Sequence, residues 1–308
     1  MSKDRILIIR AGALGDTLML LPSINALKTY YKVIVLGRRP GIGYLESCAD
    51  KCMDIEKEGW HRLFSQEADI TGIPSPEVDH VIAFINDREN IMSENLRRLF
   101  PYSTIDVFSP FPDPGSKFHV ASFMARAIQA AGIRIDYDTA FDTALKKPLI
   151  KSCKGVKKMA VLHPGSGSKT KNYSPDFWFR LLTNIKEEND NRMDTGFLLG
   201  PAEEDVFTVF YERAEEYGAR IICCPDKQEL LSILDSTYLY IGHDSGVTHL
   251  AAMLGIHTIA IFKDSSIDLW RPVGPSVRII EPDMNPDFVL KKVVRESADL
   301  MARIGNID

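Results

Sequence analysis

The sequence predicts an α/β fold made of two doubly wound, parallel-sheet domains. Short apolar runs alternate with segments of helical periodicity in both halves of the chain, and a glycine-bearing turn follows an apolar run in each half. With 308 residues the chain is long for a single hydrophobic core. Because strand–helix alternation builds parallel sheets covered on both faces, we expect domains at 1–150 and 151–308, joined by a lysine-rich linker at 146–158.

The first half predicts three strands and two helices. Residues 5–10 form an apolar run that is too short for a helix, which indicates a buried parallel strand. Residues 17–30 have helical spacing, and Pro22 within them predicts a kink or a delayed helix start. The other elements expected in this half are strands at 33–36 and 80–85 and a helix at 120–131.

The second half repeats the alternation with more elements. Five apolar runs predict strands, and the segments between them have helical periodicity. The last segment carries apolar residues at helical spacing and predicts a C-terminal helix over 286–303. The expected strands are 159–162, 196–199, 219–223, 237–241 and 257–262, and the expected helices between them are 175–188, 202–217, 227–235 and 246–254.

Composition and charge disfavour several classes of protein. The formal net charge is −5 and the sequence pI is about 5.9, which does not favour nucleic-acid binding. No apolar run approaches the ~20 residues that span a bilayer, and the N-terminus lacks a secretory signal. The cysteines are odd in number and scattered, which predicts buried, reduced thiols rather than a metal site; they are Cys48, Cys52, Cys153, Cys223 and Cys224. Reduced thiols fit a cytoplasmic protein.

The first glycine turn, Gly12–Asp16, lies directly after the strand predicted at 5–10. Its glycines permit a tight turn and let a ligand approach the backbone. The turn lacks the third glycine of a dinucleotide fingerprint and the Gly-Lys-Ser/Thr of a P-loop. Since its carboxylate would repel a phosphate, Asp16 is either a helix N-cap or a general base at the top of the sheet. The spacing alone leaves both interpretations open.

A second glycine turn, His163–Ser168, follows the first strand predicted in the second half. Two glycines and two hydroxyls stand in it, and Lys169 and Lys171 come just after. Small residues beside a lysine suit a diphosphate, because the ammonium group stabilises negative charge on a leaving group. The same pattern also fits a plain strand-to-helix turn with solvated lysines.

A third motif, Asp244–Ala252, begins a short apolar helix directly after a strand. Ser245 and Gly246 would present backbone amides to an anionic ligand. Asp244 would accept a hydrogen bond from a ribose hydroxyl or cap the helix. Taken alone, a histidine at the position of His249 is more often packed than catalytic.

Two other patterns carry less weight. Asp136–Asp138 fits the D-x-D pattern by which many sugar transferases hold a divalent ion, but it lies in a polar connection rather than at a strand end. We therefore expect no metal. The lysines of 146–158 and the arginine pairs 38–39 and 97–98 could meet an anionic acceptor or a membrane surface, although such runs are usually solvated.

Together these motifs resemble one family, the bacterial ADP-heptose:lipopolysaccharide heptosyltransferases of glycosyltransferase family 9. The resemblance rests on residues 6–27, 163–175, 244–252 and 270–275, in that order along the chain. It implies the GT-B fold, in which two Rossmann-like domains face each other across a cleft. The acceptor is then held mainly by the first domain and the donor by the second, and the helix at 286–303 crosses back to the first domain.

The resemblance also implies a reaction. It is an inverting transfer, without metal or cofactor, of heptose from ADP-heptose to a lipopolysaccharide core or another glycan or lipid-linked acceptor. Peripheral contact with the inner face of the inner membrane would follow, and nucleic acid would not be a partner. Asp16 then corresponds to the catalytic base. The donor-binding residues implied are Gly15, Ser166, Gly167, Lys171, Asp244, Ser245, Gly246, Thr248 and His249.

The chain departs from the family pattern in three places. Lys171–Ser174 stands where the family usually has Lys-x-Trp-Pro, His243 replaces the usual asparagine or threonine, and residues 262–267 differ from the common Phe-Gly and Thr-Asp-Pro. These departures leave two alternatives open: a nucleotide-sugar epimerase on the same fold, and a non-catalytic protein that binds nucleotide sugars. NAD-dependent chemistry is disfavoured because neither glycine turn fits the dinucleotide fingerprint.

Overall fold

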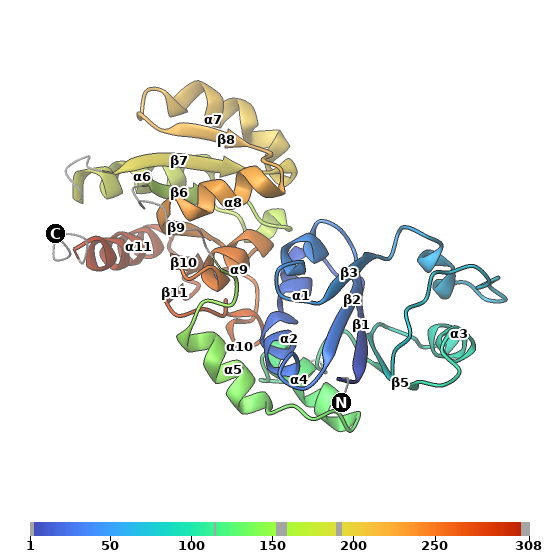
Figure 1. Ribbon diagram of the computed structural model, residues 1–308. Helices are drawn as coiled ribbons and strands as arrows, with labels where there is room; N and C mark the ends of the chain where they lie inside the picture. Colours follow the sequence, from blue (N-terminus) through green and yellow to red (C-terminus); the bar gives the residue numbers. More distant parts are fainter. Residues whose placement is uncertain (1–2, 114, 152–158, 189–192, 303–308) are drawn as a thin grey trace. The chain divides into compact units, whose positions relative to one another are not determined.

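The computed structural model describes residues 3–113, 115–151, 159–188 and 193–302. The chain divides into two compact units, Met1–Ala144 and Leu145–Asp308. Each unit contains one parallel β-sheet with helices packed around it (Figure 1). The division falls close to the predicted boundary, and the second part of the predicted linker, 152–158, lies outside the described residues.

The first unit contains a five-stranded parallel sheet in the order β3-β2-β1-β4-β5. Its central strand is built from four consecutive aliphatic residues, Ile6–Ile9, which are fully buried because helices cover both faces. The strands are β1 (Arg5–Arg10), β2 (Lys32–Gly37), β3 (Lys51–Asp54), β4 (His80–Phe84) and β5 (Thr104–Phe108). The helices are α1 (Leu14–Leu18), α2 (Leu21–Leu27), α3 (Ile91–Leu99), α4 (Val120–Ala130) and α5 (Tyr137–Lys146, which runs into the second unit), with 3₁₀ turns η1 (Gly41–Leu45) and η2 (Trp60–Phe64).

The helix predicted over 17–30 is two helices, α1 and α2. Pro22 lies in the first turn of α2, where its missing N–H costs nothing. The chain therefore ends one helix at Leu18 and begins another at Leu21, which confirms the predicted break. The sequence analysis did not predict β3, β5, α3 or α5. β3 and β5 are short strands with mostly half-buried side chains, whereas α3 and α5 are amphipathic helices that the analysis missed.

The second unit contains a six-stranded parallel sheet in the order β11-β10-β9-β6-β7-β8. The strands are β6 (Met159–His163), β7 (Asp194–Leu199), β8 (Arg220–Cys223), β9 (Thr237–His243), β10 (His257–Ile261) and β11 (Val277–Ile280). The helices are α6 (Pro175–Glu188), α7 (Phe207–Ala214), α8 (Lys227–Asp235), α9 (Gly246–Met253), α10 (Ile267–Trp270) and α11 (Pro286–Met301), with 3₁₀ turns η3 (Lys169–Lys171) and η4 (Pro201–Val206).

Most elements of this unit agree with the sequence, and three differ. The short helix α10 was not predicted. The helix predicted over 202–217 begins as the 3₁₀ turn η4 and becomes α-helical only at Phe207. The strand β11 was not predicted, since its residues are only half-buried at the edge of the sheet. The C-terminal helix α11 packs against α6 and the strands β9 to β11 of its own unit. Its crossing to the first unit stays a prediction.

Both sheets have a topological switch point at their centre. In the first unit the chain runs outward from β1 to β3 and then restarts at β4 on the other side of β1. In the second unit it runs from β6 to β8 and restarts at β9 beside β6. Loops that leave neighbouring strands in opposite directions open a crevice at the carboxyl ends of those strands, where α/β proteins bind ligands.

The prediction that all cysteines are buried is wrong for part of the set. Cys48 is buried, but Cys52 and Cys223 are half-buried and Cys224 is exposed. Cys224 follows the edge strand β8 with a left-handed backbone (φ 46°), so its side chain leaves the core. Cys153 lies outside the described residues. Among the helices of the described residues, none is long and apolar enough to cross a membrane.

Candidate active site

The second unit holds an ion pair at its switch point. Lys171 ends η3 after the β6 loop, and its Nζ lies 2.9 Å from Oδ2 of Asp244, the residue that follows β9. The other carboxylate oxygen of Asp244 lies 3.5 Å from His249 Nε2. Because β6 and β9 are neighbours in the sheet, two motifs separated by 73 residues meet around one buried carboxylate.

The surroundings keep this carboxylate ionised. Burial alone would raise the pKa of Asp244, but the hydrogen bond and charge of His249, together with the hydrogen bond from Lys171, hold it well below its usual range. The Lys171 side chain keeps 28% of its surface exposed, whereas Asp244 keeps 7%. An ammonium group has three donors, so Lys171 can bind a second anion while it stays paired with Asp244.

The helix α9 begins directly beside the ion pair. Ser245 is its N-cap, and its Oγ accepts a hydrogen bond from Thr248 N at 3.3 Å. The Thr248 hydroxyl in turn donates to the carbonyl of His243. Both side chains therefore shape the turn, while Gly246 opens the helix without a side chain. The first amides of α9, at the positive end of the helix dipole, remain suited to an anion.

Ser166 and Gly167 have different roles in the β6 loop. Ser166 is buried, and its Oγ lies 2.8 Å from the Ser168 carbonyl oxygen and 2.7 Å from Asn172 Oδ1, so it fixes the fold of the loop. Gly167 borders open space, since a Cβ placed there would meet no atom within 4 Å. Its backbone is therefore open to a ligand, whereas the hydroxyl of Ser166 is already engaged.

Two buried histidines support the two loops. His163 ends β6, and its Nδ1 lies 2.7 Å from the Tyr240 hydroxyl. His243 ends β9, and its Nε2 accepts a hydrogen bond from Tyr173 N at 3.1 Å. Burial lowers the pKa of His163 to about 4 and that of His243 to about 3. Both rings are therefore neutral near pH 7. The neutral His243 ring holds the segment after the β6 loop by accepting the hydrogen bond from the Tyr173 backbone amide.

This neutrality predicts a dependence of stability on pH. Between about pH 3 and the ordinary histidine value near 6.5, the unfolded chain binds a proton at His243 that the folded chain does not. Stability is therefore complete above pH 6.5 and falls as the pH drops, by up to about 1.4 kcal/mol per pH unit for this group. Urea unfolding at pH 7.5 and 5 should show a smaller loss for His243→Gln than for the wild type. The exposed His61→Gln is the control, and equal losses in wild type and His243→Gln would contradict the prediction.

Glu203 was not singled out from the sequence. It lies in η4 after β7, is 3% exposed, and its Oε2 accepts a hydrogen bond from Gly200 N. Its side chain packs against Gly165, where even a Cβ would collide with it. Burial raises the pKa of Glu203, and Oε1 has no hydrogen-bond partner among the described residues. In the sequence Glu203 belongs to an acidic run shortly after the strand predicted at 196–199, and such a run does not distinguish a buried carboxylate from solvated ones.

A small cavity adjoins Glu203 in the second unit. It has a volume of about 200 Å³, and Tyr173 and Asn172 line it opposite η4. Tyr173 and Glu203 thus line this cavity, while the Tyr173 hydroxyl and Glu203 Oε1 are buried without hydrogen-bond partners among the described residues.

In the first unit, Asp16 lines a cavity of about 390 Å³ at the carboxyl ends of β1, β4 and β5. Its Oδ2 accepts a hydrogen bond from Ala13 N at 3.1 Å. Ala13 is the N-cap of α1 and Asp16 is the third residue of the helix, so Asp16 is not the N-cap considered from the sequence, although its carboxylate does satisfy the amide of the N-cap residue. This hydrogen bond uses only one oxygen, so it does not prevent Asp16 from acting on a ligand in the cavity. Gly15 lies beside it in α1 but does not line this cavity. The other implied donor-binding residues belong to the second unit.

Arg10 is a second residue that the sequence did not single out. It ends β1 and is 1% exposed, and burial lowers its pKa to about 10, so it stays charged near pH 7. Its Nε donates to the Asp16 carbonyl at 3.0 Å and its Nη1 to the Pro110 carbonyl at 2.8 Å. Nη2 has no partner among the described residues. Arg10 thus joins the Asp16 loop to the opposite wall of the cavity.

The D-x-D pattern has a structural explanation. Asp136 precedes α5, and its carboxylate accepts hydrogen bonds from the amide and the hydroxyl of Thr139, at 3.1 and 2.7 Å. This is a helix cap, so the polar connection expected from the sequence is in fact the start of a helix. Within the described ranges, no group of three or more His, Cys, Asp or Glu side chains could hold a metal ion.

Comparisons with known proteins bear on the fold and the family of the chain. No curated protein matches the chain. The solved structures that it resembles include a family 9 glycosyl transferase from Veillonella parvula, with 14% identity, 98% of both chains covered and a TM-score of 0.72. ADP-heptose lps heptosyltransferase II from E. coli is 16% identical, with 98% of this chain and 99% of that chain covered and a TM-score of 0.69. E. coli heptosyltransferase WaaC with ADP is 14% identical, with 95% and 99% covered and a TM-score of 0.65.

These likenesses establish the fold, and a sequence match establishes the family. The two parallel sheets with their helices form the two Rossmann-like domains of a GT-B protein. The model of the family "Glycosyltransferase family 9 (heptosyltransferase)" matches residues 94–297, which is more than half of the chain. The chain therefore belongs to glycosyltransferase family 9.

Proposed function

We propose that this protein is an inverting, metal-independent glycosyltransferase that moves heptose from ADP-heptose to a lipopolysaccharide core or a related cell-surface glycan. The observation that carries the proposal is the Lys171–Asp244 pair beside the start of α9, in a chain of family 9. A partly exposed cation and free helix amides suit the diphosphate of a nucleotide sugar. E. coli heptosyltransferase WaaC, which has the same fold, has been solved with ADP.

Asp16 is the base in the proposed reaction. Its carboxylate takes the proton of an acceptor hydroxyl while that oxygen attacks the anomeric carbon of the donor. The attack comes from the face opposite the diphosphate, so the new C–O bond forms as the bond to the diphosphate breaks and the configuration inverts. The negative charge of the leaving diphosphate is stabilised by Lys171 and by the amides around Ser245 and Gly246.

Further residues around the donor belong to this proposal. Gly167 offers its backbone to the diphosphate, and Glu203, packed against Gly165, holds the β6 loop in place for it. His249 holds the Asp244 carboxylate in place rather than acting as a proton donor, since its Nε2 already faces that carboxylate. An acceptor anchored to lipid would bring the protein to the inner face of the membrane as a peripheral partner.

The test is a transfer assay with a matched binding experiment. Purified protein in EDTA is incubated with ADP-heptose and heptose-deficient lipopolysaccharide, and the products are separated by mass. Transfer of one heptose, together with tighter calorimetric binding of ADP than of UDP, GDP or NAD, is the expected result. A changed sugar nucleotide in the absence of acceptor would instead identify an epimerase. Nucleotide binding without any turnover would identify a non-catalytic protein.

A further inference from the structure

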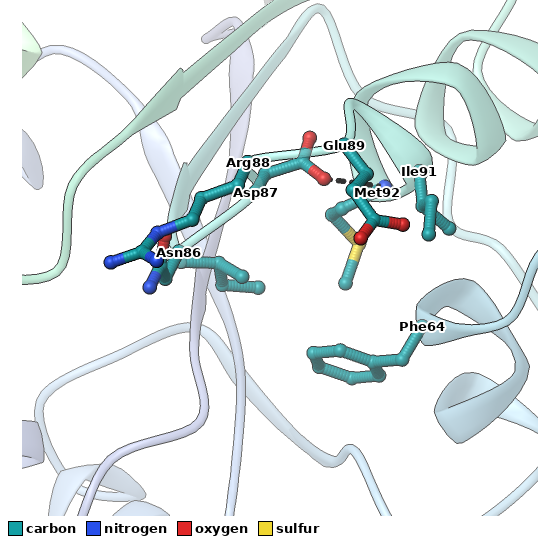
Figure 2. Close-up of a pocket in the computed structure, with 8 residues that line it drawn as sticks. Phe64, Asn86, Asp87, Arg88, Glu89, Ile91 and Met92 are labelled. Carbon is teal, nitrogen blue, oxygen red and sulfur yellow. Dashed lines mark hydrogen bonds between the residues drawn. The ribbon is translucent and has the colours of Figure 1, made fainter.

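A second cavity adjoins the Asp16 cavity in the first unit. It has a volume of about 410 Å³ and lies between η2 and the loop that joins β4 to α3 (Figure 2). Its wall towards the Asp16 cavity consists of Phe64, Ile85 and Asn86, which line both cavities. We call it the Arg88 cavity; the residues that line only this one of the two are Asp87, Arg88, Glu89, Ile91 and Met92.

The loop along this cavity is held rigidly by one carboxylate. Asp87 accepts hydrogen bonds from the amides of Met92 and Ser93, at 2.9 and 2.8 Å, and from the Ser93 hydroxyl at 2.6 Å. Burial raises the pKa of Asp87, but these hydrogen bonds outweigh it and hold the pKa below its usual value. Asp87 is therefore used to fix the loop on the start of α3, and the cavity beside it is formed before any ligand binds.

The neighbouring polar groups are not used in this way. No hydrogen bond or ion pair joins the side chain of Asn86 or Arg88 to another described residue, and both are exposed. Glu89 makes one long contact, 3.5 Å from Gln66 Nε2. An amide, a guanidinium and a carboxylate thus border the cavity with most of their hydrogen-bonding capacity free.

The lining combines apolar and polar side chains, as sugar-binding sites do. Figure 2 shows the Phe64 ring below Met92 and Glu89, with Asn86 and Arg88 to one side. The Phe64 ring suits the C–H face of a sugar ring, Ile91 and Met92 add apolar surface on the opposite side, and the polar side chains suit its hydroxyls. The charged side chains do not suit a lipid tail. The volume lies within the roughly 300–1,000 Å³ of small-ligand sites.

We propose that the Arg88 cavity is a second acceptor subsite, which holds the sugar unit next to the one that is attacked. This inference rests on the proposed function, because it takes the Asp16 cavity as the place of the attacking hydroxyl. An acceptor that fills both cavities crosses the shared wall at Asn86 and stacks against Phe64. The preferred acceptor is therefore an oligosaccharide of at least two units, and a single sugar engages only half of the site.

The experiment compares acceptors by length on the full chain. Fragments of one and two sugar units, prepared by mild acid hydrolysis of lipopolysaccharide core, are titrated calorimetrically without donor. The wild type should bind the two-unit fragment at least tenfold more tightly than the one-unit fragment. Glu89→Trp places an indole in the Arg88 cavity and should reduce that ratio at least fivefold. Glu94→Trp, at an exposed position of α3 that lines no described cavity, is the matched control and should keep the wild-type ratio.

A second variant separates loss of the subsite from loss of the fold. Phe64→Ala removes the aromatic part of the shared wall and should also lower the ratio, whereas Tyr102→Ala, an exposed aromatic away from both cavities, should not. Equal affinity of the wild type for both fragments, or a wild-type ratio in Glu89→Trp, would overturn the subsite. Since these titrations need no donor, they are independent of the transfer assay, whose failure would count against the proposed reaction instead.

Discussion

Asp16→Asn should lower the rate of sugar transfer by about 10²–10⁴-fold, the usual range for the loss of a general base. Asparagine has nearly the same shape and keeps an oxygen that can accept the hydrogen bond from Ala13 N, so the start of α1 is preserved. What it loses is the ability to take a proton. We therefore expect the turnover at saturating substrates to collapse while the calorimetric affinity for ADP stays within twofold of the wild type.

The control for this variant is Asp142→Asn, an exposed carboxylate on α5 that lines no described cavity. It should transfer sugar at the wild-type rate. Thermal unfolding of both variants excludes a folding defect as the cause of lost activity. If Asp16→Asn retains more than a tenth of the wild-type turnover, Asp16 is not the base, and its capping bond to Ala13 is then the whole of its role.

The strands that the sequence predicted are largely those at the centre of each sheet. β1, β6 and β9 are apolar along almost their whole length because helices bury them on both faces. β3, β5 and β11 are edge strands with one neighbour each and partly exposed side chains, so their sequences mix polar and apolar residues. The fourth edge strand, β8, was predicted because its run 219–223 is apolar apart from Arg220. A short mixed run carries no periodicity by which it could be told from a loop.

The residues of the candidate site also fall into two groups: those that the sequence singled out and those that only the structure showed. The sequence found Lys171, Asp244 and His249 because each lies in a loop or helix start directly after a recognisable strand, and the contact among them follows from the adjacency of β6 and β9. Arg10 and Glu203 could not be found in this manner. Arg10 donates a hydrogen bond to the carbonyl of Pro110, which is 100 residues away in the sequence. The Glu203 side chain packs against the backbone of Gly165, where there is no side chain. Such contacts depend on packing between distant segments, which no local pattern encodes.

Lys171→Met should weaken ADP binding at least tenfold and lower turnover by about 10²–10³-fold. Electrostatic groups that stabilise a leaving group typically contribute effects of this size. Methionine keeps much of the side-chain length but removes the charge and all three donors. Lys169→Met is the matched control, since Lys169 lies two residues earlier, is 77% exposed and pairs with Asp205. An exposed pair of this kind contributes little, so Lys169→Met should change ADP affinity less than threefold.

The loss in Lys171→Met has two possible origins, and a double variant separates them. Lys171 either contacts the diphosphate or only neutralises Asp244, whose buried charge would otherwise repel the anion. In the second case Lys171→Met/Asp244→Asn removes the repulsion and restores most of the ADP affinity. Because Lys171 keeps free donors and an exposed tip, we expect the first case, in which the double variant binds ADP as weakly as Lys171→Met. Recovery to within threefold of the wild type would make Lys171 a counter-ion of Asp244 and leave the diphosphate to the amides of α9.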